Sequence, residues 1–235
     1  LLVQAEKLSK PVGGAESLPP RVEEAVVQRR GGVGDVEPEG DPADARGEHR
    51  RAAHYHRVVD RERSLLAASL VRRTLAPLLD LAPQDVPVTR QCRCGSTEHG
   101  RPLVLAGDWH VSVSHGGHLV AVVAAQGRAV GVDVEEVPAA VDRGVVDLLE
   151  SAVGDTSSPE AYISGWVRLE AVVKATGEGL ARPLGDVLLD SESSTWSIRG
   201  GRSGRWADLP VSAGHRGAVA GLGAAPLSVR VAWAD

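Results

Sequence analysis

The sequence predicts an α+β fold built from two similar halves, residues 1–127 and residues 128–235. Two segments, 60–79 and 158–175, have the apolar spacing and the end signals of helices, and short segments typical of strands follow each of them. This order, helix and strands and then helix and strands again, is typical of the α+β class. No repeat of residue identity is visible between the halves, so their predicted similarity rests on the order of the elements alone.

The first half begins with a segment that gives little indication of structure. Residues 1–47 are weakly patterned and interrupted by many prolines and glycines, so we expect short elements and loops there. A clear helix follows. Apolar residues recur at four-residue spacings, as at Leu66 and Leu70, which gives residues 60–79 an apolar stripe. Pro83 prevents the helix from continuing much further.

The second helix has recognisable ends. Ser158 is a suitable N-cap, Pro159 fits the first turn, and Gly177 is expected to end the helix. Between the two helices we expect a loop over residues 91–107 and a turn over residues 114–117. The strand before that turn is expected to be half-buried, because apolar and polar residues alternate along it. The segments that we expect to form strands are 109–114, 119–125, 129–135, 196–199, 205–209, 218–222 and 227–233.

Composition and charge exclude several classes of function. The net charge is −5 and the isoelectric point is about 5.9, so we do not expect binding to nucleic acid. No apolar run approaches the about 20 residues that a bilayer-spanning helix needs, so we expect no membrane attachment. The basic residues comprise 23 arginines and only three lysines. The presence of a lysine instead of an arginine at a given position therefore needs a specific reason.

The two cysteines lie close together, at Cys92 and Cys94. Two cysteines cannot form a disulfide framework, so we expect a reducing, cytoplasmic environment. His99 could add a third ligand for zinc, but a fourth ligand is missing, and tetrahedral zinc usually takes four. We therefore interpret the cysteines as small residues of a turn-rich loop.

One predicted strand carries two acidic residues, Asp133 and Glu135. Because they are two residues apart, they point to one face of the strand, and Gly131 leaves room for a close approach. Two neighbouring carboxylates repel each other unless water or a cation surrounds them. Either an exposed strand end or a metal site would explain this pattern.

On the second helix, Trp166, Glu170 and Lys174 are four residues apart and share one face. A surface ion pair between Glu170 and Lys174 would explain the spacing, but an arginine would serve that purpose equally well in this arginine-rich chain. The compact ammonium group of a lysine suits a phosphate or a proton transfer. The lysine therefore favours a functional role over a surface pair.

A histidine and a basic segment are candidate anion sites. His115 is followed by two glycines at a strand end, where its ring could face an anion, although a hairpin with a surface histidine would have the same sequence. Residues 46–63 contain six arginines and three histidines and form either a solvated helix face or an anion site. A hydrolase based on Ser114 and His115 is not supported, because adjacent strand residues point apart and no Gly-x-Ser-x-Gly motif is present.

Four motifs in this order resemble the Sfp-type 4′-phosphopantetheinyl transferases. The pair formed by the last two motifs is specific, whereas either of them alone would be weak. The resemblance extends from about residue 50 to the C-terminus and fades over residues 1–47. The motifs are Gly-Arg-Pro at 100–102, Ser-Val-Ser-His at 112–115, Val-Gly-Val-Asp-Val-Glu at 130–135 and Trp-x-x-x-Glu-Ala-x-x-Lys at 166–174.

The resemblance implies two α+β halves related by a pseudo-twofold axis, with coenzyme A (CoA) in the cleft between them. It implies transfer of the phosphopantetheine arm of CoA to a serine of an apo acyl or peptidyl carrier protein, with release of 3′,5′-ADP. Carrier proteins of this kind serve polyketide or nonribosomal peptide biosynthesis, and the sequence does not indicate which of them are modified. We therefore expect a monomeric, cytoplasmic, Mg²⁺-dependent enzyme.

The resemblance also assigns roles to individual residues. Asp133, Glu135 and Glu170 are the implied Mg²⁺ ligands, since this cation prefers hard oxygen donors. Glu170 is also the implied base for the serine hydroxyl, and Lys174 is implied to neutralise the pyrophosphate. The 3′-phosphate of CoA is implied to be held by Arg50 or Arg51 together with Arg63 and Ser64. The residues implied to bind CoA are Arg50, Arg51, Arg63, Ser64, Arg101, Pro102, Ser114, His115 and Lys174.

Two residues depart from the family pattern. Leu169 stands where the family usually has a lysine, and Gly116 stands where it often has a serine. A helix places Leu169 about 100° from Glu170, so we expect Leu169 to border the site. We expect Leu169→Lys to be tolerated and to raise kcat or to tighten CoA binding. We expect both departures to affect the catalytic rate more than the fold.

Two alternatives stay open. A non-catalytic relative that binds CoA or a carrier protein would fit Leu169 and the unmatched segment 1–47. Such a protein would be expected to lose some of Asp133, Glu135, Glu170 and Lys174, which are all retained. An unrelated Mg²⁺-dependent phosphohydrolase would need a water-activating cluster of histidines or aspartates, which the sequence lacks.

Overall fold

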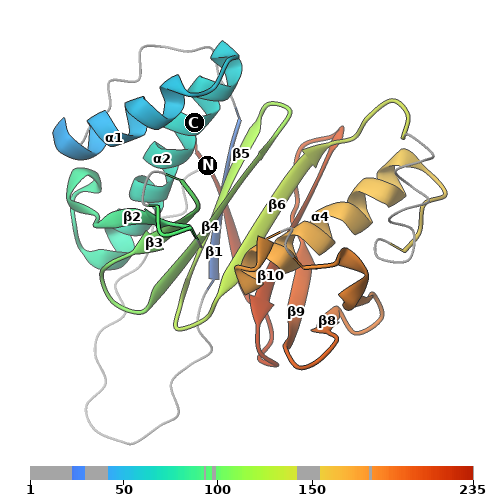
Figure 1. The fold of residues 1–235 in the computed structure, drawn as a ribbon. Helices are drawn as coiled ribbons and strands as arrows, with labels where there is room; N and C mark the ends of the chain where they lie inside the picture. Colours follow the sequence, from blue (N-terminus) through green and yellow to red (C-terminus); the bar gives the residue numbers. More distant parts are fainter. Residues whose placement is uncertain are drawn as a thin grey trace, which may run out of the picture.

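The computed structural model describes residues 23–29, 42–92, 94–96, 99–141, 154–179 and 182–234. These residues form a four-stranded, a five-stranded and a two-stranded sheet together with helices (Figure 1), so the predicted α+β class is confirmed. Within the weakly patterned segment 1–47, residues 1–22 and 30–41 lie outside the described residues. Among the helices of the described part, none has the length and apolar character needed to cross a membrane.

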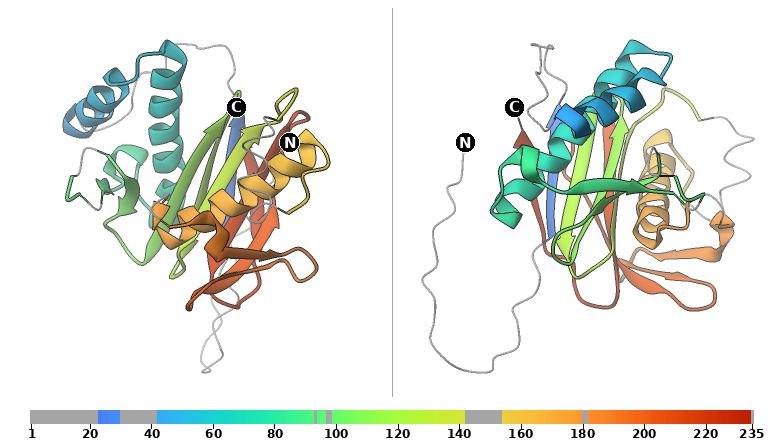
Figure 2. Two further views of the ribbon diagram at one scale, coloured as in Figure 1. Left: turned by 45° about the vertical axis from the view of Figure 1, so that its right-hand side comes forward. Right: turned by 60° about the vertical axis from the view of Figure 1, so that its left-hand side comes forward.

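The four-stranded sheet combines strands from both ends of the chain, in the order β11-β1-β5-β4. Strand β1 pairs in parallel with β11, which lies beside it in Figure 2, and antiparallel with β5. Strand β5 is apolar on both faces because helix α2 covers one face and the second sheet covers the other. The elements are β1 (Glu23–Arg29), α1 (Pro42–Ala53), α2 (Val58–Leu79), β4 (Trp109–Gly116), β5 (Leu119–Gln126) and β11 (Val229–Ala234).

The five-stranded sheet has the order β6-β10-β9-β8-β7, and its neighbouring strands are antiparallel. Helix α4 packs on one face, in a core that includes the buried rings of Trp196 and Trp206. Ser158 Oγ accepts a hydrogen bond from the N–H of Ala161 at 3.1 Å, and Gly177 follows the helix with a φ of 70°, so the predicted caps are confirmed. The elements are β6 (Val130–Glu136), α4 (Pro159–Thr176), β7 (Val187–Asp190), β8 (Thr195–Ile198), β9 (Ser203–Asp208) and β10 (His215–Leu222).

Three sequence-based predictions need correction. The expected loop over residues 91–107 contains β3 (Arg101–Val104), which pairs with β2 (Val88–Gln91) in the two-stranded sheet. The expected turn over residues 114–117 is also wrong in part, since β4 continues to Gly116 before the chain turns. Strand β7 lies where the sequence predicts none. Strands β2, β3 and β7 have four residues each and too little alternation to be recognised from the sequence, although the sequence predicts the equally short β8. The other predicted helices and strands are present, with ends shifted by a few residues.

The two large sheets meet where β4 lies beside β6. The serine face of β4, expected to be exposed, is buried there: Ser112 and Ser114 are covered, and Ser112 Oγ accepts the N–H of Val132 at 3.2 Å. A Cβ atom at Gly116 would lie 2.3 Å from the carbonyl oxygen of Val134. The strands therefore approach so closely that position 116 has no room for a side chain.

We expect the change Gly116→Ser to destabilise the protein rather than to restore the polar contact of the family pattern. The new side chain would push β4 away from β6, and overpacking of this kind costs about 1–3 kcal/mol. Thermal unfolding measures the effect, with Gly185→Ser as the control, because a Cβ atom at Gly185 would meet nothing within 4 Å. Equal melting temperatures for the two variants would contradict the close approach of the strands.

Candidate functional site

A cleft of about 1280 Å³ is lined by the β2–β3 hairpin, β4, β6 and α4. Most small-molecule sites measure about 300–1000 Å³, so this cleft has room for a large, extended ligand. Trp166, Glu170 and Lys174 all line it, which confirms that they share one face of α4. The expected site residues that line the cleft are Ser64, Arg101, Pro102, Ser114, His115, Asp133, Glu135, Glu170 and Lys174.

A hydrogen-bonded cluster lies in the cleft where three elements meet. Asp133 of β6 is 3% exposed, and its Oδ1 accepts hydrogen bonds from Ser114 Oγ of β4 and from Lys174 Nζ of α4, each at 2.6 Å. Lys174 Nζ also donates to Ser114 Oγ at 2.9 Å. The second oxygen, Oδ2, is buried and has no hydrogen-bond partner among the described residues. A buried acceptor without a partner is costly, so this oxygen is available to a ligand.

The close packing of α4 on β6 brings Lys174 to Asp133. A Cβ atom at Gly131 would lie 2.0 Å from the carbonyl oxygen of Ala171 and 2.5 Å from the amide nitrogen of Ala175. Only glycine permits this spacing. The close approach that the sequence predicts at Gly131 is confirmed, and the group that approaches is the backbone of the helix.

Three carboxylates share the cleft with one ammonium group. Burial raises the pKa of Glu135 to about 7, and the negative charge of Asp133 adds to this effect. Burial and Asp133 also raise the pKa of Glu170, whereas Lys174 opposes the shift. The three carboxylates do not come together closely enough to form one compact set of ligands. If one oxygen is taken from each of them, the three oxygens never all lie within 4.8 Å of one another in the described part of the chain. A cation held by two carboxylates and completed by water or phosphate oxygens would suit this arrangement.

Arg63 lies beside the cleft, at the end of β4. Its guanidinium donates to Asp60 Oδ1 at 3.1 Å and to the carbonyl oxygen of Gly117. Loss of hydration and the charge of Arg63 lower the pKa of His115, so this imidazole is mostly neutral at pH 7. Arg63 therefore supplies the fixed positive charge at this end of the site, and His115 supplies a hydrogen-bonding ring.

Arg50 and Arg51 stand in the last turn of α1 and do not line the cleft. The charge of Arg51 nevertheless affects Arg90, a cleft residue that the sequence does not single out. Arg90 donates to the carbonyl oxygen of Gly100 at 2.9 Å, and burial and the nearby Arg51 lower its pKa. An anion at this place would relieve the repulsion between the two arginines. Arg90 belongs to β2, a strand that the sequence does not predict.

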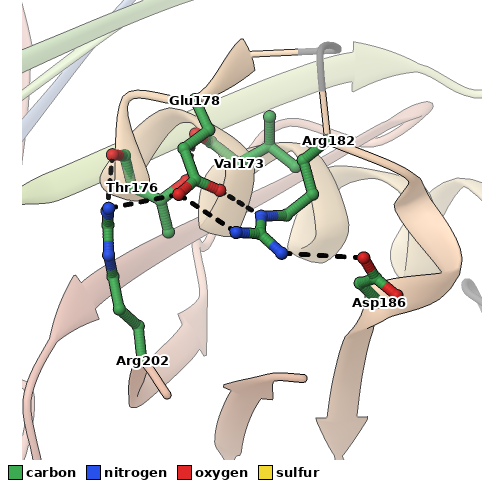
Figure 3. Close-up of polar contacts among 6 residues, drawn as sticks. All are labelled: Val173, Thr176, Glu178, Arg182, Asp186 and Arg202. Atoms are coloured by element: carbon green, nitrogen blue, oxygen red, sulfur yellow. Dashed lines mark hydrogen bonds and ion pairs between the residues drawn. The ribbon is translucent and has the colours of Figure 1, made fainter. Parts of the chain in front are cut away.

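A network of ion pairs holds the part of the cleft wall that follows α4 (Figure 3). Glu178, which lines the cleft, accepts hydrogen bonds from Arg182 and pairs with Arg202 at 3.1 Å. Arg202 Nη1 also donates to the carbonyl oxygen of Thr176 at 2.9 Å, and Arg182 pairs with Asp186 at 3.6 Å. The end of α4 is thereby tied to the segment between β8 and β9.

Leu169 does not border the cleft, so the sequence-based expectation is wrong. Its side chain is 0% exposed and belongs to the core between α4 and the five-stranded sheet. The rotation of about 100° from Glu170 is enough to turn it from the cleft to the sheet. Arg168 is held elsewhere, because it donates to both carboxylate oxygens of Asp208 at 2.8 and 2.6 Å and stacks over Trp206. Of the basic residues of α4, only the lysine lines the cleft.

Comparison with known proteins identifies no family for this chain. No family model matches the sequence, and no curated protein matches it. The function must therefore be inferred from the residues of the cleft and from the resemblance of the four motifs.

Proposed function

We propose that the protein transfers the 4′-phosphopantetheine arm of CoA to a serine of an apo acyl or peptidyl carrier protein. One observation carries this proposal: Asp133, Glu170 and Lys174 converge from β6 and α4 on a cleft of about 1280 Å³. Transfer from a pyrophosphate needs carboxylates that hold a cation and a fixed positive charge near the leaving group. These three residues offer both.

The order of the strands supports two related halves with a pseudo-twofold axis. Strands β1, β5 and β4 are neighbours in the first sheet, and β6, β10 and β9 are neighbours in the second, with antiparallel pairing throughout both sets. In each set a helix and a two-stranded hairpin follow the first strand, namely α2 with β2–β3 and α4 with β7–β8. Within the described residues, helix α1, which precedes α2, and strand β11, which joins the first sheet, have no counterpart in this scheme.

Mg²⁺ fits the residues present in the cleft. Asp133 Oδ2 is buried without a partner, and burial and negative charge raise the pKa of both Glu135 and Glu170. A divalent cation would relieve these costs, and two of the three carboxylates would hold it together with water and phosphate oxygens. When bound, Mg²⁺ supplies neutralisation of the pyrophosphate and polarisation of the phosphorus.

The protein's own residues move the proton and place the charge. Glu170, whose pKa is raised toward neutral pH, takes the proton of the carrier serine hydroxyl. The serine oxygen then forms its bond to the phosphorus of the phosphopantetheine arm while the bond to 3′,5′-ADP breaks, and ADP leaves with the electron pair. Lys174, fixed by Ser114 and Asp133, offsets the negative charge that develops on the leaving phosphate.

Incubation of the full chain with CoA, Mg²⁺ and an apo carrier protein, followed by measurement of the intact mass, tests this function. We expect the carrier to gain one phosphopantetheine, and a carrier that lacks the acceptor serine to gain nothing. Binding of CoA without transfer to any of several carriers would indicate the non-catalytic relative. Neither binding nor transfer would overturn the proposal.

We expect Arg51→Ala and Arg63→Ala to weaken recognition of the nucleotide 3′-phosphate. A charge-assisted hydrogen bond is worth about 1.5–3 kcal/mol, so each variant should raise the KM for CoA by about tenfold or more. The KM for 3′-dephospho-CoA should change little. The control is Arg199→Ala, at an exposed arginine outside the cleft lining. Equal increases in KM for both ligands would show that these arginines do not contact the 3′-phosphate.

We expect Glu135→Gln to raise the melting temperature at pH 8 and to change it little at pH 4, without divalent cations. The folded-state pKa of about 7 lies above 4.5, the usual value for a glutamate side chain, so the folded protein loses stability as the pH rises through this interval. Glutamine is neutral at both pH values and removes that loss. Glu192→Gln, at an exposed turn, is the control and should melt like the wild type at both pH values.

The same melting experiment tests the metal. Mg²⁺ should raise the melting temperature of the wild type at pH 8, because it binds the folded carboxylates. The increase should be smaller for Glu135→Gln. A wild-type melting temperature that does not respond to Mg²⁺ would count against a metal at these carboxylates.

A further inference from the structure

The loop between β2 and β3 brings three soft ligand atoms together beside the cleft. One atom each from Cys92, Cys94 and His99, the two Sγ atoms and a ring nitrogen, lie within 4.8 Å of one another. Cys94 Sγ is 3.5 Å from His99 Nε2, and neither cysteine is in a disulfide. Cys94 and His99 are exposed and Cys92 is half-buried, so an ion from solution can reach all three. None of them belongs to the carboxylate cluster described above.

The backbone of this loop places the thiols. The N–H of Cys92 donates to the carbonyl oxygen of Ser96 at 3.1 Å, and the N–H of Gly95 donates to the carbonyl oxygen of Cys92 at 3.0 Å. Gly95 has a φ of 84°, in the left-handed region that favours glycine. The N–H of Cys94 donates to Cys92 Sγ at 3.5 Å, which orients the sulfur within the loop. The pairing of β2 with β3 fixes both ends of the loop.

We propose that Cys92, Cys94 and His99 bind one Zn²⁺ ion, with water as the fourth ligand. Bonds of about 2.3 Å to sulfur and about 2.0–2.1 Å to nitrogen place the ligand atoms of a tetrahedral site about 3.6–3.8 Å apart. The separation of 3.5 Å between Cys94 and His99 is close to this value, and the other pairs lie within 4.8 Å. Thiolate and imidazole donors select zinc over the hard cation Mg²⁺, and binding releases the thiol protons.

Zinc at this place would shape one wall of the cleft. Cys92, Gly95 and Gly100 line the cleft, and the loop leads directly into β3. The first residue of β3, Arg101, packs against the end of α4, where a Cβ atom at Gly177 would lie 2.8 Å from Arg101 Nη1. An ion that holds the loop therefore also holds Arg101 against α4. The proposed ion would hold the loop, and its binding does not depend on the proposed transfer reaction.

Titration of the full, reduced chain with Co²⁺ tests the site without any substrate. Co²⁺ replaces zinc in thiolate sites and then absorbs in the near ultraviolet through sulfur-to-metal charge transfer. We expect this absorption to reach a plateau at one Co²⁺ per chain and to disappear when one equivalent of Zn²⁺ is added. A count of two reactive thiols before the titration establishes that both cysteines are reduced.

Variants assign the ligands. Loss of an outer hydrogen bond to a metal ligand weakens metal binding by about 10–100-fold. Cys94→Ser and His99→Ala each remove a ligand itself, so each should weaken Co²⁺ binding by more than this. Cys94→Ser should also lose most of the charge-transfer absorption. Two controls should bind as the wild type does: Ser96→Ala in the same loop, and His54→Ala at an exposed histidine outside it.

Two results would overturn the proposal. The first is no charge-transfer absorption at one equivalent of Co²⁺ although both thiols are reduced. The second is Co²⁺ binding that survives Cys94→Ser but is lost in Asp133→Asn, because the ion would then occupy the carboxylates instead. Failure of the carrier-protein assay would leave the cobalt result unaffected, so the two proposals fail separately.

Discussion

Asp133→Asn is expected to lower the rate of the proposed phosphopantetheine transfer by about 1000-fold, because loss of one well-placed electrostatic contact has an effect of this size. Asparagine keeps the shape of the side chain but removes the charge that pairs with Lys174 and faces the proposed metal. Initial rates from the intact-mass assay, at saturating CoA and Mg²⁺, measure the effect. The matched control is Asp190→Asn, at the exposed last residue of β7 outside the cleft lining, which should keep the wild-type rate.

Loss of folding must be separated from loss of chemistry in this experiment. Breaking a buried ion pair can cost about 3–5 kcal/mol, so Asp133→Asn could fail to fold. Glu170→Gln is the second variant, since Glu170 is only half-buried and makes no ion pair in the described structure. It should melt like the wild type and lose a comparable factor in rate. A folded Glu170→Gln protein with a rate within tenfold of wild type would refute the assignment of the base and metal ligand.

Leu169→Lys is expected to lower the melting temperature by about 10 °C or more. The side chain is 0% exposed, so the change removes apolar burial and places an unpaired charge in the core. A cost of about 4 kcal/mol is expected for such a change, and each kcal/mol lowers the melting temperature by about 2–4 °C in a protein of this size. Restoring the lysine of the family pattern should therefore damage this protein rather than accelerate it.

Two controls separate burial from chemistry at position 169. Leu169→Met conserves volume and should cost less than about 1.5 kcal/mol. Leu188→Lys makes the same chemical change at a leucine that is 53% exposed on β7, and it should leave the melting temperature nearly unchanged. If Leu169→Lys and Leu188→Lys melt at the same temperature, Leu169 is not part of the core.

The departures at Leu169 and Gly116 show how a motif comparison can mislead about single residues. In the family pattern both positions carry polar groups, and the sequence alone favours an effect on rate. In the structure Leu169 packs against the five-stranded sheet, and Gly116 touches the backbone of β6. Both residues are constrained sterically by strands that are distant in sequence, so no local sequence pattern could reveal these constraints.

The convergence of soft ligands in the β2–β3 loop could not be predicted for the same reason. The spacing of Cys92, Cys94 and His99 is compatible with many loop shapes, and the pairing of β2 with β3 selects one of them. Arg90 lines the cleft because of that pairing as well. Both observations depend on a hairpin of four-residue strands, which is too short for periodicity to indicate.

The sequence by itself determined the features that depend on neighbours within a few residues: the α+β class, the two long helices with the caps at Ser158 and Gly177, and the shared face of Glu170 and Lys174. The tertiary structure determined which distant segments these helices and strands contact. It joined Asp133 to Ser114 and Lys174, covered the serine face of β4, and put β11 beside β1. The physical reason is that capping and periodicity act along the chain, whereas burial and pairing are set by segments that are far apart in sequence and meet only when the sheets pack together.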